Sequence, residues 1–142
     1  MIQQKEITLP GFRRGYHLIT RIIEESLPDL PATGLQHILV KHTSAGITIN
    51  ENADPTVRSD FEGYMNKIIP ENDPVYQHND EGSDDMPAHL KSSVIGAEIT
   101  IPVTRNRLNL GTWQGIYFCE FRNYGGGRKN GLNVFRCQRL TV

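Results

Sequence analysis

The prediction of the fold depends most on the stretch ILVKHTSAGITI, residues 38–49. Apolar and β-branched residues gather at its two ends, in Ile38-Leu39-Val40 and in Ile47-Thr48-Ile49, and such runs are typical of strands. Between them, the polar segment Lys41-His42-Thr43-Ser44 interrupts the apolar pattern. The stretch therefore predicts two strands, or one bent strand.

Helices are predicted on both sides of this stretch. Apolar residues recur at helical spacing from Tyr16 to Leu27, where a proline follows and ends the run. Asp54-Pro55 is typical of an N-cap followed by proline in the first helical position, and it opens an apolar stripe that ends at Ile69-Pro70. A shorter helix over residues 87–94 is predicted to carry His89.

Strands are predicted near both ends of the chain. One covers residues 3–9, and the strands after Gly96 cover residues 98–103, 107–110, 115–121 and 132–142. Because the helices come early and the strands late, the order favours an α+β fold over a regular parallel βαβ fold. A chain of 142 residues has the commonest length of one domain, so we expect a single domain over 1–142.

The composition argues against several functional classes. The net charge of -1 gives no basic excess, so no nucleic-acid partner is expected. No apolar run approaches the ~20 residues that cross a bilayer, and the N-terminus lacks the pattern of a signal peptide. We therefore expect no membrane partner and a cytoplasmic protein, in which Cys119 and Cys137 are buried thiols.

Three of the five histidines lie among polar residues: His42, His78 and His89. The acidic residues between the last two are Asp80, Glu81, Asp84 and Asp85. Imidazoles with nearby carboxylates suit a transition-metal site, and the carboxylates alone suit Mg²⁺ or a general base. The alternative is that these histidines are solvated or hydrogen-bonded structural residues, and the spacing alone does not decide.

Small polar residues around His42 are candidates for ligand binding. Thr43, Ser44 and Asn50 have side chains that hydrogen-bond polar ligands, although ordinary turn chemistry explains them equally well. Ser44 lacks the glycine-flanked elbow of serine hydrolases. A serine nucleophile is therefore not predicted.

Two further segments suggest binding near the C-terminal strands. Arg122, Arg128 and Lys129 lie beside the run Gly125-Gly126-Gly127, which predicts either an anion-binding hairpin or a flexible hairpin tip. Trp113, the only tryptophan, lies in a predicted turn. Its large apolar ring favours packing over a pocket or a subunit contact.

Three segments together resemble the YjbQ family, described as secondary thiamine-phosphate synthases. They are HTSAGITINENADP at 42–55, the region from His78-Asn79-Asp80 to Ala88-His89-Leu90-Lys91, and LGTWQGIY at 110–117. Their order and spacing cover nearly the whole chain. The resemblance implies an α/β sandwich with a mainly antiparallel sheet and two main helices, assembled as a homotrimer with a site at or near the subunit interface.

The resemblance also implies a transferase activity and roles for particular residues. The reaction joins an aminopyrimidine-methyl diphosphate to a thiazole phosphate and releases pyrophosphate. The implied metal or catalytic histidines and their carboxylate partners are His42, His78, His89, Asp54 and Asp80. Residue type alone suggests that Arg122, Arg128 and Lys129 bind the phosphates and that Trp113 stacks on the pyrimidine.

The expected metal leaves more than one function open. Three histidines suit Zn²⁺ or another borderline metal, whereas the departure of a diphosphate normally uses Mg²⁺ held by oxygen ligands. This mismatch favours an alternative, a metal-dependent hydrolase of a small phosphorylated metabolite, in which bound water becomes acidic. A third possibility is a non-catalytic trimer that binds a metal or a small ligand.

Overall fold

The computed structural model describes residues 2–27, 29–124 and 131–138. The stretch at 38–49 forms two strands, β3 (Thr33–Val40) and β4 (Ala45–Glu51), which belong to different sheets. Residues 41–44 carry the chain from one sheet to the other. His42, Thr43 and Ser44 therefore lie at the junction of the two sheets.

Both sheets are antiparallel, which confirms the predicted α+β class and mainly antiparallel arrangement. The larger sheet has the strand order β1-β8-β3-β5-β6. Its other strands are β1 (Ile2–Thr8), β5 (Glu98–Thr104), β6 (Arg107–Leu108) and β8 (Gly131–Gln138). The smaller sheet has the order β2-β7-β4, with β2 (Gly15–Leu18) and β7 (Gln114–Glu120) beside β4.

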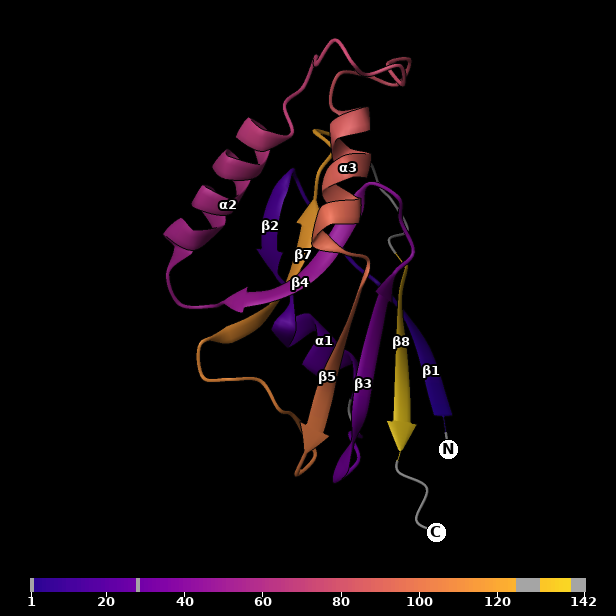
Figure 1. Ribbon diagram of the computed structural model, residues 1–142. Helices are drawn as coiled ribbons and strands as arrows, with labels where there is room; N and C mark the ends of the chain where they lie inside the picture. Colours follow the sequence, from indigo (N-terminus) through magenta and orange to yellow (C-terminus); the bar gives the residue numbers. More distant parts are fainter. Residues whose placement is uncertain (1, 28, 125–130, 139–142) are drawn as a thin grey trace.

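Strand β7 is buried on both faces and defines the layers. Ile116 and Phe118 join the core that contains residues of the larger sheet, such as Ile38. Tyr117 and Cys119 point the other way, into a second cluster with residues of the helices. Each large apolar side chain buried in this way stabilises the fold by about 1.5–3 kcal/mol. The smaller sheet thus lies between the larger sheet and two helices (Figure 1).

These two helices are α2 (Pro55–Ile68) and α3 (Asp85–Ile95), which pack on β2 and β4 respectively. The predicted cap is confirmed, because the Asp54 side chain accepts a hydrogen bond from the Thr56 N–H, and α2 ends before Ile69-Pro70. Helix α3 begins at Asp85, two residues before the predicted start. A third, short helix, α1 (Thr20–Ser26), packs against the main core.

The prediction of a helix starting at Tyr16 was wrong at its beginning. Residues 15–18 form β2 instead, because their backbone groups pair with 117–120 of β7. Helical spacing from position 16 onward does not reveal this long-range pairing. Tyr16 instead contributes its ring to the cluster beneath the helices.

Residues 69–84 form the longest irregular connection in the described part of the chain, between α2 and α3, as Figure 1 shows. None of the helices in the described residues has the length and apolar character needed to cross a bilayer. Arg128, Lys129 and residues 139–142 lie outside the described residues.

Candidate metal centre

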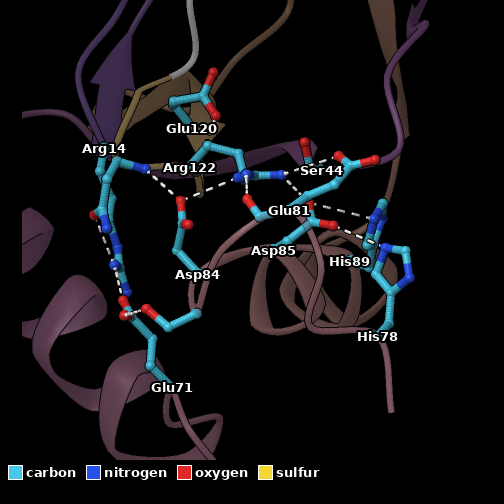
Figure 2. A network of polar contacts seen from close by, with 12 residues as sticks. Arg14, Ser44, Glu71, His78, Glu81, Asp84, Asp85, His89, Glu120 and Arg122 are labelled. Carbon is cyan, nitrogen blue, oxygen red and sulfur yellow. Dashed lines mark hydrogen bonds and ion pairs between the residues drawn. The ribbon is translucent and has the colours of Figure 1, made fainter. Parts of the chain in front are cut away.

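Three side chains converge where the long connection enters α3. One ligand atom each from His78, Asp85 and His89 lies within 4.8 Å of the others. Asp85 and His89 are four residues apart on α3, so they share one face of the helix, and the connection places His78 beside them (Figure 2). Nε2 of His78 lies 2.8 Å from Oδ2 of Asp85, and Nε2 of His89 lies 3.6 Å from Oδ1.

The carboxylate of Asp85 is buried, while the two imidazoles reach solvent. Its side chain is 2% exposed, compared with 51% for His78 and 32% for His89. A cation held by the three groups would therefore have protein on the carboxylate side and solvent on the histidine side. Three protein ligands with open positions are typical of catalytic rather than structural metal sites.

Arg122 binds one oxygen of this buried carboxylate. Its Nη1 donates a hydrogen bond to Oδ1 of Asp85, and its Nη2 donates to the backbone carbonyl of Glu81 at 2.8 Å. The other oxygen, Oδ2, is buried and accepts no hydrogen bond from the described residues. Nε2 of His78 lies within ion-pair distance of Oδ2, at 2.8 Å, but without hydrogen-bond geometry. A buried oxygen in this state is costly, and a cation between it and the imidazoles would satisfy it.

Asp84 anchors the other side of the Arg122 guanidinium. Its Oδ2 accepts hydrogen bonds from Nε of Arg122 at 3.0 Å and from the Asn123 N–H at 2.8 Å. Burial alone would raise the pKa of Asp84, but these two donors outweigh it and hold the pKa below its ordinary value. Arg122 therefore sits between two carboxylates and fixes the position of Asp85.

A backbone carbonyl orients the ring of His89. Its Nδ1 lies 3.0 Å from the carbonyl oxygen of Thr43, which can only accept a hydrogen bond, so we assign the proton to Nδ1. The neutral ring then presents the lone pair of Nε2 toward Asp85. An imidazole held through its other nitrogen is the usual arrangement of a metal ligand. Two nitrogens and one carboxylate oxygen suit Zn²⁺ or another borderline divalent metal.

His42 is close to this centre but does not belong to the three-ligand group. Its Nδ1 accepts a hydrogen bond from the Ser44 N–H at 3.1 Å and lies 3.2 Å from the Ser44 hydroxyl. His42 and Thr43 line a pocket together with His89, Ser92 and Ser93. The structure thus brings His78 and His89 together with a carboxylate, and it places His42 beside them, in the pocket.

The two predicted carboxylate partners lie elsewhere. Asp54 is the exposed N-cap of α2, and hydrogen bonds from the Thr56 hydroxyl and N–H lower its pKa. Asp80 is exposed in the connection before α3 and is not a member of the metal-binding group. Asp85, one of the acidic residues between His78 and His89, occupies that position instead. The spacing of Asp85 and His89, four apart, was the available signal, but the predicted helix began after Asp85.

The other predicted binding residues divide between two places. Ser44 is buried beside His42, whereas Asn50 and Trp113 lie at the far end of the smaller sheet. Asn50 pairs with Gly115 near one end of β7, and Ala45 pairs with Glu120 at the other. At about 3.3 Å per residue, the length of β7 separates these ends by about 20 Å. Within one chain, Trp113 therefore does not reach the histidines, and the residue is 66% exposed.

Comparisons with known proteins agree on one family. The family described as UPF0047 protein YjbQ-like matches residues 5–136. The UPF0047 protein YjbQ of Salmonella typhimurium is 53% identical over 131 residues, which are 91% of this chain and 94% of that protein. The UPF0047 protein YugU of Bacillus subtilis is 47% identical over 104 residues, which are 72% of this chain and 76% of that protein.

Solved structures show the same fold. A conserved hypothetical protein from Thermus thermophilus superposes with a TM-score of 0.75 at 34% identity, over 95% of this chain and 98% of that one. A hypothetical protein from Aeropyrum pernix superposes with a TM-score of 0.76 at 29% identity, over 95% of this chain and 96% of that one. The descriptions of these four relatives name neither a reaction nor a ligand.

Proposed function

We propose that this chain, which belongs to the YjbQ-like UPF0047 family, is a metal-dependent hydrolase of a small phosphorylated metabolite. The observation that carries this proposal is the buried Oδ2 of Asp85, which faces His78 without a hydrogen bond. The resemblance to thiamine-phosphate synthases is what suggests a phosphorylated substrate.

The side chains of the centre have separable tasks in this reaction. When bound, a divalent cation supplies Lewis acidity and brings the pKa of a bound water toward neutrality. Arg122 holds Oδ1 of Asp85 and so keeps Oδ2 directed at the histidines. The Thr43 carbonyl holds Nδ1 of His89 and keeps its Nε2 available as a ligand.

His42 is our proposed proton donor. Because the Ser44 N–H occupies the lone pair of Nδ1, a neutral His42 carries its proton on Nε2. His42 lines the same pocket as His89, so a substrate bound there would lie between the centre and this imidazole. Donation of the Nε2 proton to the leaving oxygen would assist cleavage by about 10²–10⁴-fold.

Metal content tests the centre directly. After reconstitution with Zn²⁺ and dialysis, elemental analysis should find about one metal per chain in the wild type and much less in His78→Ala, His89→Ala and Asp85→Asn. His37→Ala is the matched control, because His37 contacts Thr100 on the larger sheet and lies outside the centre. A wild type without metal, or an Asp85→Asn variant that retains it, would overturn the proposal.

Turnover tests the role of His42 apart from the metal. We expect His42→Gln to keep its metal and its fold, measured by elemental analysis and circular dichroism, while hydrolysis of a chromogenic phosphate ester falls at least a hundredfold. Unchanged turnover in His42→Gln would remove its role as proton donor. Metal binding without hydrolysis of any phosphate ester by the wild type would instead favour the non-catalytic binding protein.

The thiamine-phosphate synthase reaction is less well supported by the described residues. The guanidinium of Arg122 already donates hydrogen bonds to Asp84, Asp85 and the Glu81 carbonyl, so few of its N–H groups are left to bind a diphosphate. Trp113 lies at the opposite end of β7 from the histidines. Mg²⁺-dependent formation of thiamine phosphate from the two substrates, unaffected by Asp85→Asn, would reverse this order of preference.

We further propose that the chain assembles as a homotrimer with the site near the subunit interface. Large exposed side chains support this, including Trp113 at 66% and Val94 at 64% exposure. In a closed ring, the Trp113 end of one chain can approach the histidines of its neighbour. Native mass spectrometry should find three chains in the wild type and dissociation in Trp113→Ala, whereas Val75→Ser, an exposed loop variant, should remain a trimer.

A further inference from the structure

A second polar pocket lies between β2 and the beginning of α2. It is lined by Tyr16 and His17 of β2, by Arg13 just before that strand, and by Arg58, Ser59 and Glu62 of α2. Its volume is about 350 Å³, which is near the lower limit of pockets that take small ligands. None of the three ligands of the candidate metal centre lines this pocket.

The charge of this pocket favours an anion. Arg13 and Arg58 form no ion pair or side-chain hydrogen bond within the part of the chain that the structure describes. Arg14, which also lines the pocket, is paired with Glu71, and Glu62 supplies one negative charge against the two uncommitted guanidinium groups. Burial is the main cause that lowers the pKa of His17. The charges of Arg13 and Arg58 lower it further, against the opposing effects of the Arg13 carbonyl and of Glu62.

A buried hydroxyl gives an independent indication of a missing partner. Tyr16 is 7% exposed, and its phenolic oxygen is buried without a hydrogen bond among the described residues. A hydroxyl in this state loses its hydration without compensation, so such groups are rare unless a ligand or water completes them. Ser59 adds a second hydroxyl to the lining, and α2 begins at Pro55, beside the pocket.

We propose that this pocket binds a phosphate group, either as inorganic phosphate or as the phosphate of a monoester. Arg58 and Arg13 provide planar, charged donors that match phosphate oxygens. The Tyr16 and Ser59 hydroxyls donate the remaining hydrogen bonds. This site goes beyond the proposed hydrolase, because it requires neither a metal nor the three ligands of the candidate centre.

Titration calorimetry with inorganic phosphate tests the site, with sodium chloride of equal ionic strength as the blank. We expect saturable binding to the wild type and a dissociation constant raised about tenfold or more in Arg58→Gln and in Arg13→Gln. Lys67→Gln is the matched control, because it removes the same charge from α2 without touching this pocket, and it should bind like the wild type. Tyr16→Phe should weaken binding while keeping the ring in its apolar cluster.

The same titration of His89→Ala separates this site from the metal centre. Phosphate binding that persists in His89→Ala and fails in Arg58→Gln supports the proposal, even if the centre proves to hold no metal. Binding that fails in His89→Ala and persists in Arg58→Gln would put phosphate at the metal centre and overturn the proposal. Absence of saturable binding to the wild type would overturn it as well.

Discussion

Arg122 and Asp85 form an ion pair that is almost entirely removed from solvent, with side chains 15% and 2% exposed. The guanidinium engages Oδ1 and leaves Oδ2 toward the histidines. Because neither charge is well hydrated, loss of one partner leaves the other buried and unpaired, which typically costs about 3–5 kcal/mol. One contact therefore supports both the fold and the geometry of the candidate metal centre.

Replacement of Arg122 should weaken both metal binding and the stability of the fold. We expect Arg122→Gln to lower the affinity for Zn²⁺ by about 10–100-fold, as loss of a residue that positions a metal ligand usually does. It should also lower the free energy of unfolding by about 3 kcal/mol. Competition with a chromogenic chelator measures the first effect, and urea unfolding measures the second. Arg107→Gln, at the exposed position of β6, should change neither, and wild-type Zn²⁺ affinity in Arg122→Gln would contradict the positioning role.

Asp54 and Asp85 should behave differently when each is replaced. Asp54→Ala removes the N-cap of α2 and should lower the free energy of unfolding by about 1 kcal/mol, with metal content unchanged. Asp85→Asn should reduce metal content, because the amide cannot supply a charged ligand. Thermal unfolding and elemental analysis of the two variants make this comparison. Loss of metal from Asp54→Ala would restore Asp54 to the catalytic role that the family resemblance implies.

Local signals predicted the parts of the fold that depend on neighbouring residues. Asp54-Pro55 predicted the start of α2 because capping and a fixed proline φ act within a few positions. The runs at 38–40 and 47–49 predicted strands because the preference of β-branched and apolar residues for strands is also a local signal. Tyr16 was assigned to a helix because its pairing with Cys119 of β7 bridges a hundred or so positions that local periodicity does not contain.

The site was predictable only in part, for a related reason. His78 and His89 were expected together because both are flanked by carboxylates, but the choice among those carboxylates depends on where α3 begins, since only Asp85 lies on that helix. Arg122 was assigned to phosphate, and its contacts with Asp84 and Asp85 join residues 38 and 37 positions away. Such pairing follows from where β7 ends relative to α3, which only the assembled fold determines.

Gly115 is predicted to tolerate no side chain. A Cβ at this position would lie 2.7 Å from Cδ2 of Leu18 and 2.9 Å from Cβ of Asn52, so Gly115→Ala forces a shift of packed groups. We expect it to lower the free energy of unfolding by about 1–3 kcal/mol. Gly63→Ala on α2 is the opposite case, because its Cβ would meet nothing within 4 Å and alanine favours the helix by about 1 kcal/mol. Urea unfolding that found equal effects in the two variants would contradict this packing.

Lys91 should make the free energy of unfolding depend on pH in the alkaline range. It is 1% exposed on α3, and its ammonium donates a hydrogen bond to Oδ1 of Asn66, the same oxygen that Arg14 approaches. Burial and the nearby Arg14 charge lower its pKa from 10.5 to about 8, against the opposing effect of nearby carboxylates. The folded protein therefore releases this proton near pH 8, whereas the unfolded chain keeps it until about 10.5.

Between the folded-state pKa of Lys91, about 8, and its ordinary value of 10.5, the unfolded state binds more protons than the folded state. The contribution of Lys91 to the free energy of unfolding therefore rises with pH in this range, by up to about 3 kcal/mol. Burial raises the pKa of the Cys119 thiol, so above its ordinary value of 9.0 this thiol makes the free energy of unfolding fall with pH. This effect is the same in the wild type and in Lys91→Met, so it does not change the difference between them. We therefore expect the free energy of unfolding of the wild type to rise relative to Lys91→Met from pH 7 to 10 in urea titrations. Lys67→Met, a change of an exposed lysine, should show no such trend, and a constant difference between the wild type and Lys91→Met would mean that Lys91 keeps an ordinary pKa.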